Sequence, residues 1–149
     1  MVTRGKLLRL IDEARVKEAI RQAERKSSGE IRVSVAPLFW GDVQKAAQKA
    51  FGRMGMTATK DRNGVLLFIV PARRKFVVLG DSGIHERVGQ EFWHRIAEVV
   101  SDKFRDGDFT EGLVEAIGLA GEQLAAHFPP EAGHNPNELP DDLDYGSKS

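Results

Sequence analysis

Apolar and polar positions follow two different periods along this chain. In residues 12–27, apolar side chains recur at helical spacing after Asp12, which has the side chain and the position of a helix N-cap. Residues 30–36, with the sequence EIRVSVA, alternate between apolar and polar side chains, which predicts a half-exposed strand. A short helix is then predicted from Asp42 to Gly52, where helical spacing returns.

The second half of the chain continues with two strands and two helices. Residues 65–70 are apolar throughout, which is typical of a strand covered on both faces. A short turn follows, and it predicts that residues 75–79 return antiparallel to this strand. One helix is predicted around residues 92–104, and another from Asp108, which forms a capping-box pattern with Glu111.

This order of elements predicts a three-layer α/β/α sandwich. A right-handed crossover makes the first two strands parallel, and the hairpin adds the third strand antiparallel, so the sheet is small and mixed. Helices then cover both of its faces. A chain of 149 residues has the size of one domain, which we place at residues 1–128, followed by a polar, acidic tail at 129–149.

Composition and charge argue against several classes of protein. Basic and acidic residues each number 22, so no excess charge favours nucleic acid as a partner. The absence of cysteine excludes disulfides and thiolate metal sites. No apolar run has the length of a membrane span, and the first residues lack the apolar core of a signal peptide. We therefore expect a cytoplasmic protein without membrane insertion.

Three carboxylates are expected to meet at one end of the sheet. Glu30 opens the first strand, Asp61 precedes the second, and Asp81 follows the third. Because neighbouring carboxylates need a compensating charge, and calcium and magnesium prefer oxygen ligands, these three residues predict a divalent-metal site. The alternative is that they are solvated or cap backbone amides, a role that suits Asp81 in its Gly-Asp-Ser-Gly turn.

Other polar candidates lie near the same end. Gly80 and Gly83 allow an anion-binding nest, although a tight turn at the strand exit is the simpler interpretation. A Walker motif is absent, and we expect no nucleotide or organic cofactor. His85 is the histidine closest to the carboxylates and could act as an acid or a ligand.

Two apolar segments have two interpretations each. The Leu-Phe-Trp segment at residues 38–40 could plug the core, which we prefer, or form an exposed interaction patch. In the tail, Leu139, Leu143 and Tyr145 could dock on the domain or on a partner. A disordered tail is the alternative, and we prefer it slightly.

The chain resembles the TPM domain, which is known from thylakoid-lumen acid phosphatase-like proteins, photosystem II repair proteins and many bacterial proteins. It looks most like the short bacterial members. The resemblance covers residues 12 to about 145 and is carried by five segments: AERKSSGEIRVSV, GMTATKDRNGVLLFIV, RRKFVVLGDSGI, FRDGDFTEGLVEAI and GEQLAAHFP. It implies an α/β/α sandwich, divalent-metal binding in some members, and weak acid phosphatase activity in the plant branch.

One position departs from the family pattern. Many members have an Asp-Asn pair before the second strand, where this sequence has Arg62 and Asn63, with Asp61 displaced by one position. Arg62 could pair with Asp81 or bind an anion. We therefore favour a binding or assembly module with an unidentified protein partner and an optional calcium or magnesium ion. The alternative is a weak metal-assisted acid phosphatase, in which Asp61 and Asp81 hold the cation.

Overall fold

The computed structural model describes residues 10–130 and 143–146 and confirms the predicted order of elements. Two helices begin with the expected caps, since Asp12 and Asp42 each accept a hydrogen bond from the backbone amide three residues on. The elements are α2 (Glu13–Arg25), β1 (Glu30–Val35), α3 (Val43–Arg53), β2 (Gly64–Val70), η1 (Pro71–Arg73), β3 (Lys75–Gly80), α4 (Ser82–Arg105) and α5 (Phe109–His127).

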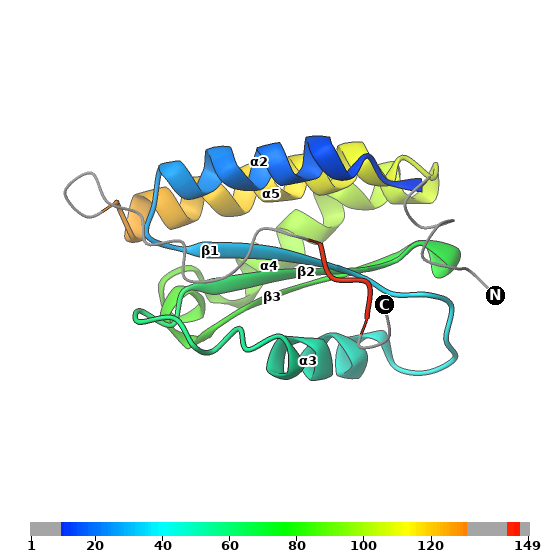
Figure 1. Ribbon diagram of the computed structural model, residues 1–149, viewed down its shortest axis with the longest axis horizontal. Coiled ribbons are helices and arrows are strands. Elements are labelled where there is room, and N and C mark those ends of the chain that lie inside the picture. Colours follow the sequence, from blue (N-terminus) through cyan, green and yellow to red (C-terminus); the bar gives the residue numbers. More distant parts are fainter. Residues whose placement is uncertain (1–9, 131–142, 147–149) are drawn as a thin grey trace.

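The three strands form one mixed sheet in the order β1-β2-β3 (Figure 1). β1 runs parallel to β2, with Glu30 opposite Gly64, and β3 runs antiparallel to β2, with Gly80 opposite Val65. The start of β1, the start of β2 and the end of β3 therefore lie at one end of the sheet, as the sequence predicted.

Helices cover both faces of this sheet, which confirms the α/β/α sandwich (Figure 1). Every residue of β2 is buried, and its side chains alternate between two cores. Val65, Leu67 and Ile69 pack with α2, α4 and α5 in the larger core. The intervening side chains, such as Phe68, pack with α3 in the smaller one. No described helix has both the length and the apolar character needed to cross a membrane.

The expectation of a half-exposed β1 is wrong, because every residue of this strand except Arg32 is buried. Part of the reason lies in the segment 143–146, which runs along the outer edge of β1. The Asp144 amide donates to the Val33 carbonyl at 2.8 Å, and the Val35 amide donates to the Asp144 carbonyl at 2.7 Å. The slight preference for a disordered tail is therefore wrong for these four residues, while Leu139 lies outside the described residues.

Two features of the last helices differ from expectation. Asp108 makes no side-chain cap to α5, and the expected capping box does not form: the Glu111 side chain pairs with Arg15 of α2, and the Asp108 amide donates to the Lys103 carbonyl at 2.8 Å. α4 begins at Ser82, ten residues before the predicted apolar stripe, and Gly89 interrupts it with a φ of 77°. Glycine reaches this left-handed conformation without the strain of a side chain, so the chain can change direction there and continue as a helix.

Candidate functional site

The best-defined polar group at the predicted end of the sheet is an ion pair between Arg62 and Asp81. The guanidinium donates through Nε to Oδ2 at 2.6 Å and through a terminal nitrogen to Oδ1 at 2.9 Å. This two-pronged geometry is the strongest form of an Arg–carboxylate contact. The Asp81 side chain is only 5% exposed, whereas that of Arg62 is 49% exposed. Of the two roles proposed for Arg62, pairing with Asp81 is the one observed.

The backbone around Asp81 fixes this pair. Asp81 is the N-cap of α4, and its Oδ1 accepts from the Ser82 amide at 2.8 Å. Arg62 has a φ of 51°, a left-handed conformation that few side chains adopt without strain. The Asp81 carboxylate thus receives three donors, two from Arg62 and one from Ser82.

The Gly-Asp-Ser-Gly turn is a packing turn. The Asp81 amide donates to the Gly64 carbonyl at 2.9 Å, and the Gly83 amide donates to the Arg62 carbonyl at 2.8 Å. Because the intervening Ser82 amide is bonded to Asp81, three successive amides already have protein acceptors. These amides do not form an anion nest, so the tight-turn interpretation is the correct one.

The other two predicted carboxylates lie in different environments. Glu30 is fully buried at the start of β1, while Asp61 is exposed in the loop before β2. The topology therefore brings their backbones to one end of the sheet, but the two side chains differ in exposure. Within residues 10–130 and 143–146, no three histidine or acidic side chains are placed to hold a metal ion. The calcium or magnesium site predicted at these carboxylates therefore stays a prediction from the sequence.

His85 has a local structural role. Its Nδ1 accepts a hydrogen bond from the Trp93 indole at 3.2 Å, so the two residues connect the parts of α4 on either side of Gly89. An accepting Nδ1 places the proton of a neutral imidazole on Nε2.

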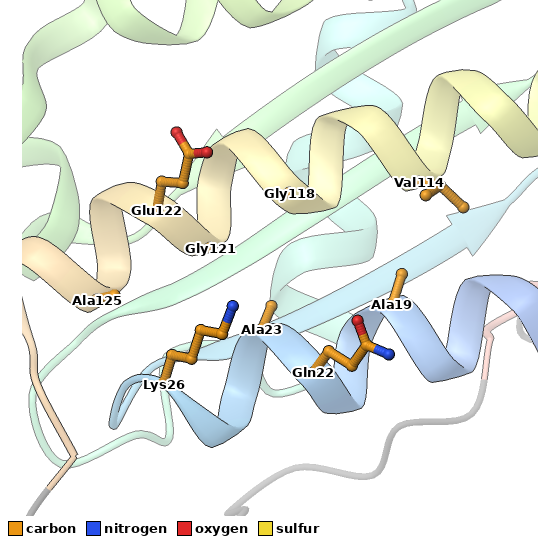
Figure 2. A pocket seen from close by; sticks show the side chains of 9 residues that line it. All are labelled: Ala19, Gln22, Ala23, Lys26, Val114, Gly118, Gly121, Glu122 and Ala125. Carbon is orange, nitrogen blue, oxygen red and sulfur yellow. The ribbon is translucent and has the colours of Figure 1, made fainter.

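Two of the pockets on the described surface offer little chemistry. One of about 220 Å³ lies beside Asp81 and contains one other polar side chain, that of Gln48. A groove of about 430 Å³ runs between α2 and α5 (Figure 2). Small side chains line most of it, and Lys26 and Glu122 stand towards one end in Figure 2. Neither pocket has the convergent set of polar groups that binding sites for small molecules usually have.

The most exposed large apolar side chain in the described part of the chain is Trp40, at 86%. It lies in the β1–α3 loop with Leu38, which is 37% exposed, so the preference for a core plug is wrong for both residues. Between them, Phe39 packs against the smaller core. Arg73 holds this loop by donating to the carbonyls of Phe39 at 3.2 Å and Gly41 at 2.8 Å. We call residues 38–40 the tryptophan loop.

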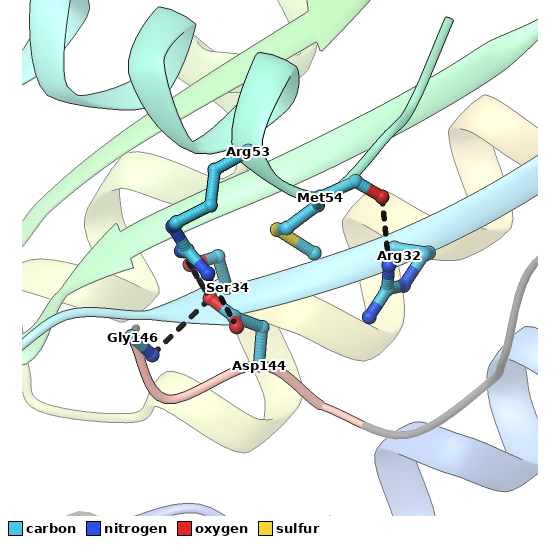
Figure 3. Close-up of polar contacts among 6 residues, drawn as sticks. All are labelled: Arg32, Ser34, Arg53, Met54, Asp144 and Gly146. Atoms are coloured by element: carbon cyan, nitrogen blue, oxygen red, sulfur yellow. Dashed lines mark hydrogen bonds and ion pairs between the residues drawn. The ribbon is translucent and has the colours of Figure 1, made fainter. Parts of the chain in front are cut away.

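A cluster of polar side chains around Asp144 joins the C-terminal segment to β1 and α3 (Figure 3). Asp144 accepts from the Ser34 hydroxyl at 2.7 Å and from both terminal nitrogens of Arg53, at 3.1 and 2.8 Å. Burial alone raises the pKa of Asp144, but hydrogen bonds from Arg53 and Ser34 outweigh it, and the pKa lies below its ordinary value of 3.8. The ionised carboxylate therefore stabilises the docked segment.

This shift predicts a pH dependence of docking. Because the folded pKa of Asp144 is depressed, its contribution is complete above pH 3.8 and disappears as the pH falls through the folded pKa. We expect NMR signals of the Gly146 amide and the Tyr145 ring to report release of the segment below pH 3.8, before the domain unfolds. Asp144→Asn should remove this step. The same acid transition in that variant would contradict the prediction.

Comparison with known proteins agrees with this architecture. A family model described as the TPM domain matches residues 2–123. The NMR structure of the BA42 protein from the psychrophilic bacterium Bizionia argentinensis has a TM-score of 0.83 and 36% sequence identity, over 91% of this chain and 92% of that one. A search of curated proteins returned no match.

Two more distant solution structures support the fold alone. The N-terminal domain of a protein from P. gingivalis has a TM-score of 0.62 at 20% identity, over 81% of this chain and 88% of that one. The N-terminal domain of the cg2496 protein from Corynebacterium glutamicum has a TM-score of 0.59 at 14% identity, over 74% and 70% of the two chains.

Proposed function

This chain belongs to the TPM domain family, and we propose that it acts as a binding module that contacts a protein partner through the tryptophan loop. The observation that carries the proposal is the 86% exposure of Trp40 on a loop whose carbonyls are held by Arg73. Phosphatase chemistry has less support, because Asp81 is engaged by Arg62 and by the start of α4.

A held, exposed tryptophan is suited to protein binding. Tryptophan and arginine are the residues most enriched at interface hot spots, where a large ring fills a pocket on the partner. A ring whose backbone is already fixed loses less conformational entropy on binding than one on a mobile loop. Leu38 of the same loop adds a second exposed apolar side chain, and Arg73 brings a charged group to the loop backbone at Gly41. A protein surface with an apolar pocket fits this arrangement.

Site-specific photocrosslinking tests the tryptophan loop. A crosslinking amino acid at position 40 should trap a discrete partner in lysate, whereas the same group at exposed Glu91 of α4 should not. Excess wild-type protein should compete for the crosslink, and excess Trp40→Ala protein should not. The Trp40→Ala variant should stay within about 0.5 kcal/mol of wild-type stability, as exposed substitutions usually do. Equal competition by both proteins would refute the proposal.

The divalent cation at Glu30, Asp61 and Asp81 stays a prediction from the sequence. A cation at Asp81 has to displace Arg62, so Arg62→Gln should strengthen calcium or magnesium binding by on the order of tenfold, and Asp81→Asn should abolish it. Titration of both ions, followed by NMR of the Asp61 and Asp81 amides, measures this effect. Unchanged spectra in wild type and in Arg62→Gln would eliminate the cation site.

Release of phosphate from a generic monoester, measured on the same samples, tests the phosphatase alternative. Our proposal expects no turnover above the protein-free rate with either ion. Turnover that disappears in Asp81→Asn but persists in Trp40→Ala would instead assign the family's phosphatase chemistry to this chain and place its centre at Asp81.

A further inference from the structure

The C-terminal segment 143–146 lies along the outer edge of β1, and its side chains alternate between the two faces of the sheet. Leu143 and Tyr145 are each 7% exposed and belong to the larger core, on the side of α2. Asp144 lies between them, pairs in parallel with Ser34, and takes part in the polar group that involves α3. Alternation of this kind is what an added strand needs at a sheet edge, where backbone bonds supply affinity and side chains supply specificity.

The carboxylate of Asp144 is the specific part of this contact. Arg53, the last residue of α3, donates from both terminal nitrogens, and the Ser34 hydroxyl donates from the strand itself (Figure 3). The Gly146 amide also donates to the same carboxylate at 3.2 Å, which folds the segment around it. An amide or a neutral side chain in place of Asp144 would lose the charge-assisted bonds with Arg53.

The segment reaches this edge through a long connection. Fourteen residues separate Phe128, at the end of α5, from Leu143. Tethering to its own domain through these 14 residues gives the docked segment an effective concentration of roughly millimolar at the edge. Docking within one chain therefore prevails at micromolar protein, but the same segment of another chain presents identical chemistry to the same edge. Exchange of identical elements between copies is a common route to dimers.

We propose that the outer edge of β1 is a docking site for residues 143–146 of a second copy of this chain, selected by Ser34 and Arg53 through Asp144. The chain's own segment is the resident occupant, and the second copy competes with it. This site is separate from the tryptophan loop and does not depend on the function proposed for that loop.

Complementary full-length variants test the exchange directly. Arg53→Gln impairs the receiving edge but leaves an intact Asp144 to donate, and Asp144→Asn impairs the donated segment but leaves an intact edge. At roughly 100 µM, well below the millimolar effective concentration, a 1:1 mixture should contain at least fivefold more dimer than either variant alone by sedimentation. When the Arg53→Gln protein also carries Asp144→Asn, the same mixture should contain no dimer. A mixture as monomeric as its components would overturn the proposal.

A charge-matched control separates recognition of Asp144 from general attraction. Lys45→Gln removes a positive charge from the same helix, at an exposed side chain outside this polar group. Mixed with Asp144→Asn, the Lys45→Gln protein should give no more dimer than Asp144→Asn alone. Equal dimer with the Lys45→Gln and Arg53→Gln partners would also overturn the proposal.

A second measurement applies if Arg53→Gln fails to fold by circular dichroism. A fluorescent peptide of residues 139–149 should bind the Asp144→Asn protein at least fivefold more tightly than wild type, whose own segment competes. The peptide carrying Asp144→Asn should bind at least tenfold more weakly. Equal affinity of the peptide for the two proteins would be as damaging as a monomeric mixture.

Discussion

Gly83→Ala is expected to destabilise the protein by about 3 kcal/mol, the upper part of the usual range for overpacking substitutions. A Cβ at position 83 would lie 2.1 Å from the Asp61 carbonyl oxygen and 2.6 Å from that of Arg62. Both atoms belong to the backbone, so no rotamer change can relieve the contact. Urea unfolding, followed by fluorescence of the buried Trp93, measures the loss.

Gly118→Ala supplies the matched control for this substitution. Position 118 lies within α5, and an added Cβ there has no heavy atom within 4 Å. The same chemical change should therefore stabilise the protein by about 0.5–1 kcal/mol, the ordinary advantage of alanine over glycine inside a helix. Similar small effects at both positions would contradict the close approach of α4 to the loop at residues 61–62.

The layers of the fold were predictable because local periodicity and burial agree. The unbroken apolar run at residues 65–70 indicated a central strand, and all of β2 is buried between two cores. The short turn after it indicated the hairpin that places β3 antiparallel to β2. The first turns of α4 were missed, because the predicted stripe begins at Phe92 and the helix is interrupted at Gly89.

The candidate site was predictable at the level of the backbone and not of the side chains. Topology placed Glu30, Asp61 and Asp81 at one end of the sheet, but it carries no information on where each carboxylate points. For Asp81, the left-handed backbone of Arg62 and the two hydrogen bonds from its guanidinium fix the direction of the carboxylate. The only signal in the sequence was the Arg62-Asn63 pair, for which pairing of Arg62 with Asp81 was one of two interpretations.

Docking of the tail depends on contacts far apart in the chain. Ser34 and Asp144 are separated by 110 positions, so no local spacing relates them. The alternating Leu-Asp-Tyr pattern was the available signal, and it is equally compatible with a free acidic tail. Because the outer edge of β1 would expose backbone groups without this segment, the need to cover that edge is a stronger argument for docking than the tail's own composition.

Asp81→Ala is the second substitution with a large expected effect, a loss of about 2–3 kcal/mol. It removes the N-cap of α4, which typically contributes about 1 kcal/mol, together with the buried acceptor of Arg62. Asp81→Asn is the matched variant, because asparagine is an equally good cap but lacks the charge. It should retain about 1 kcal/mol of the stability that alanine loses, measured by the same urea unfolding.

The pattern of these losses distinguishes a structural Asp81 from a ligand. If the carboxylate mainly serves Arg62, Asp81→Asn should cost much less stability in an Arg62→Gln background than in wild type, because its partner is already absent. A residue held in place for an external ligand behaves differently: its removal abolishes binding with little loss of stability. Our assignment would therefore be reversed if the Asp81→Ala variant unfolded at the same urea concentration as wild type but lost a calcium or magnesium response. The carboxylate end of the sheet would then be the functional centre.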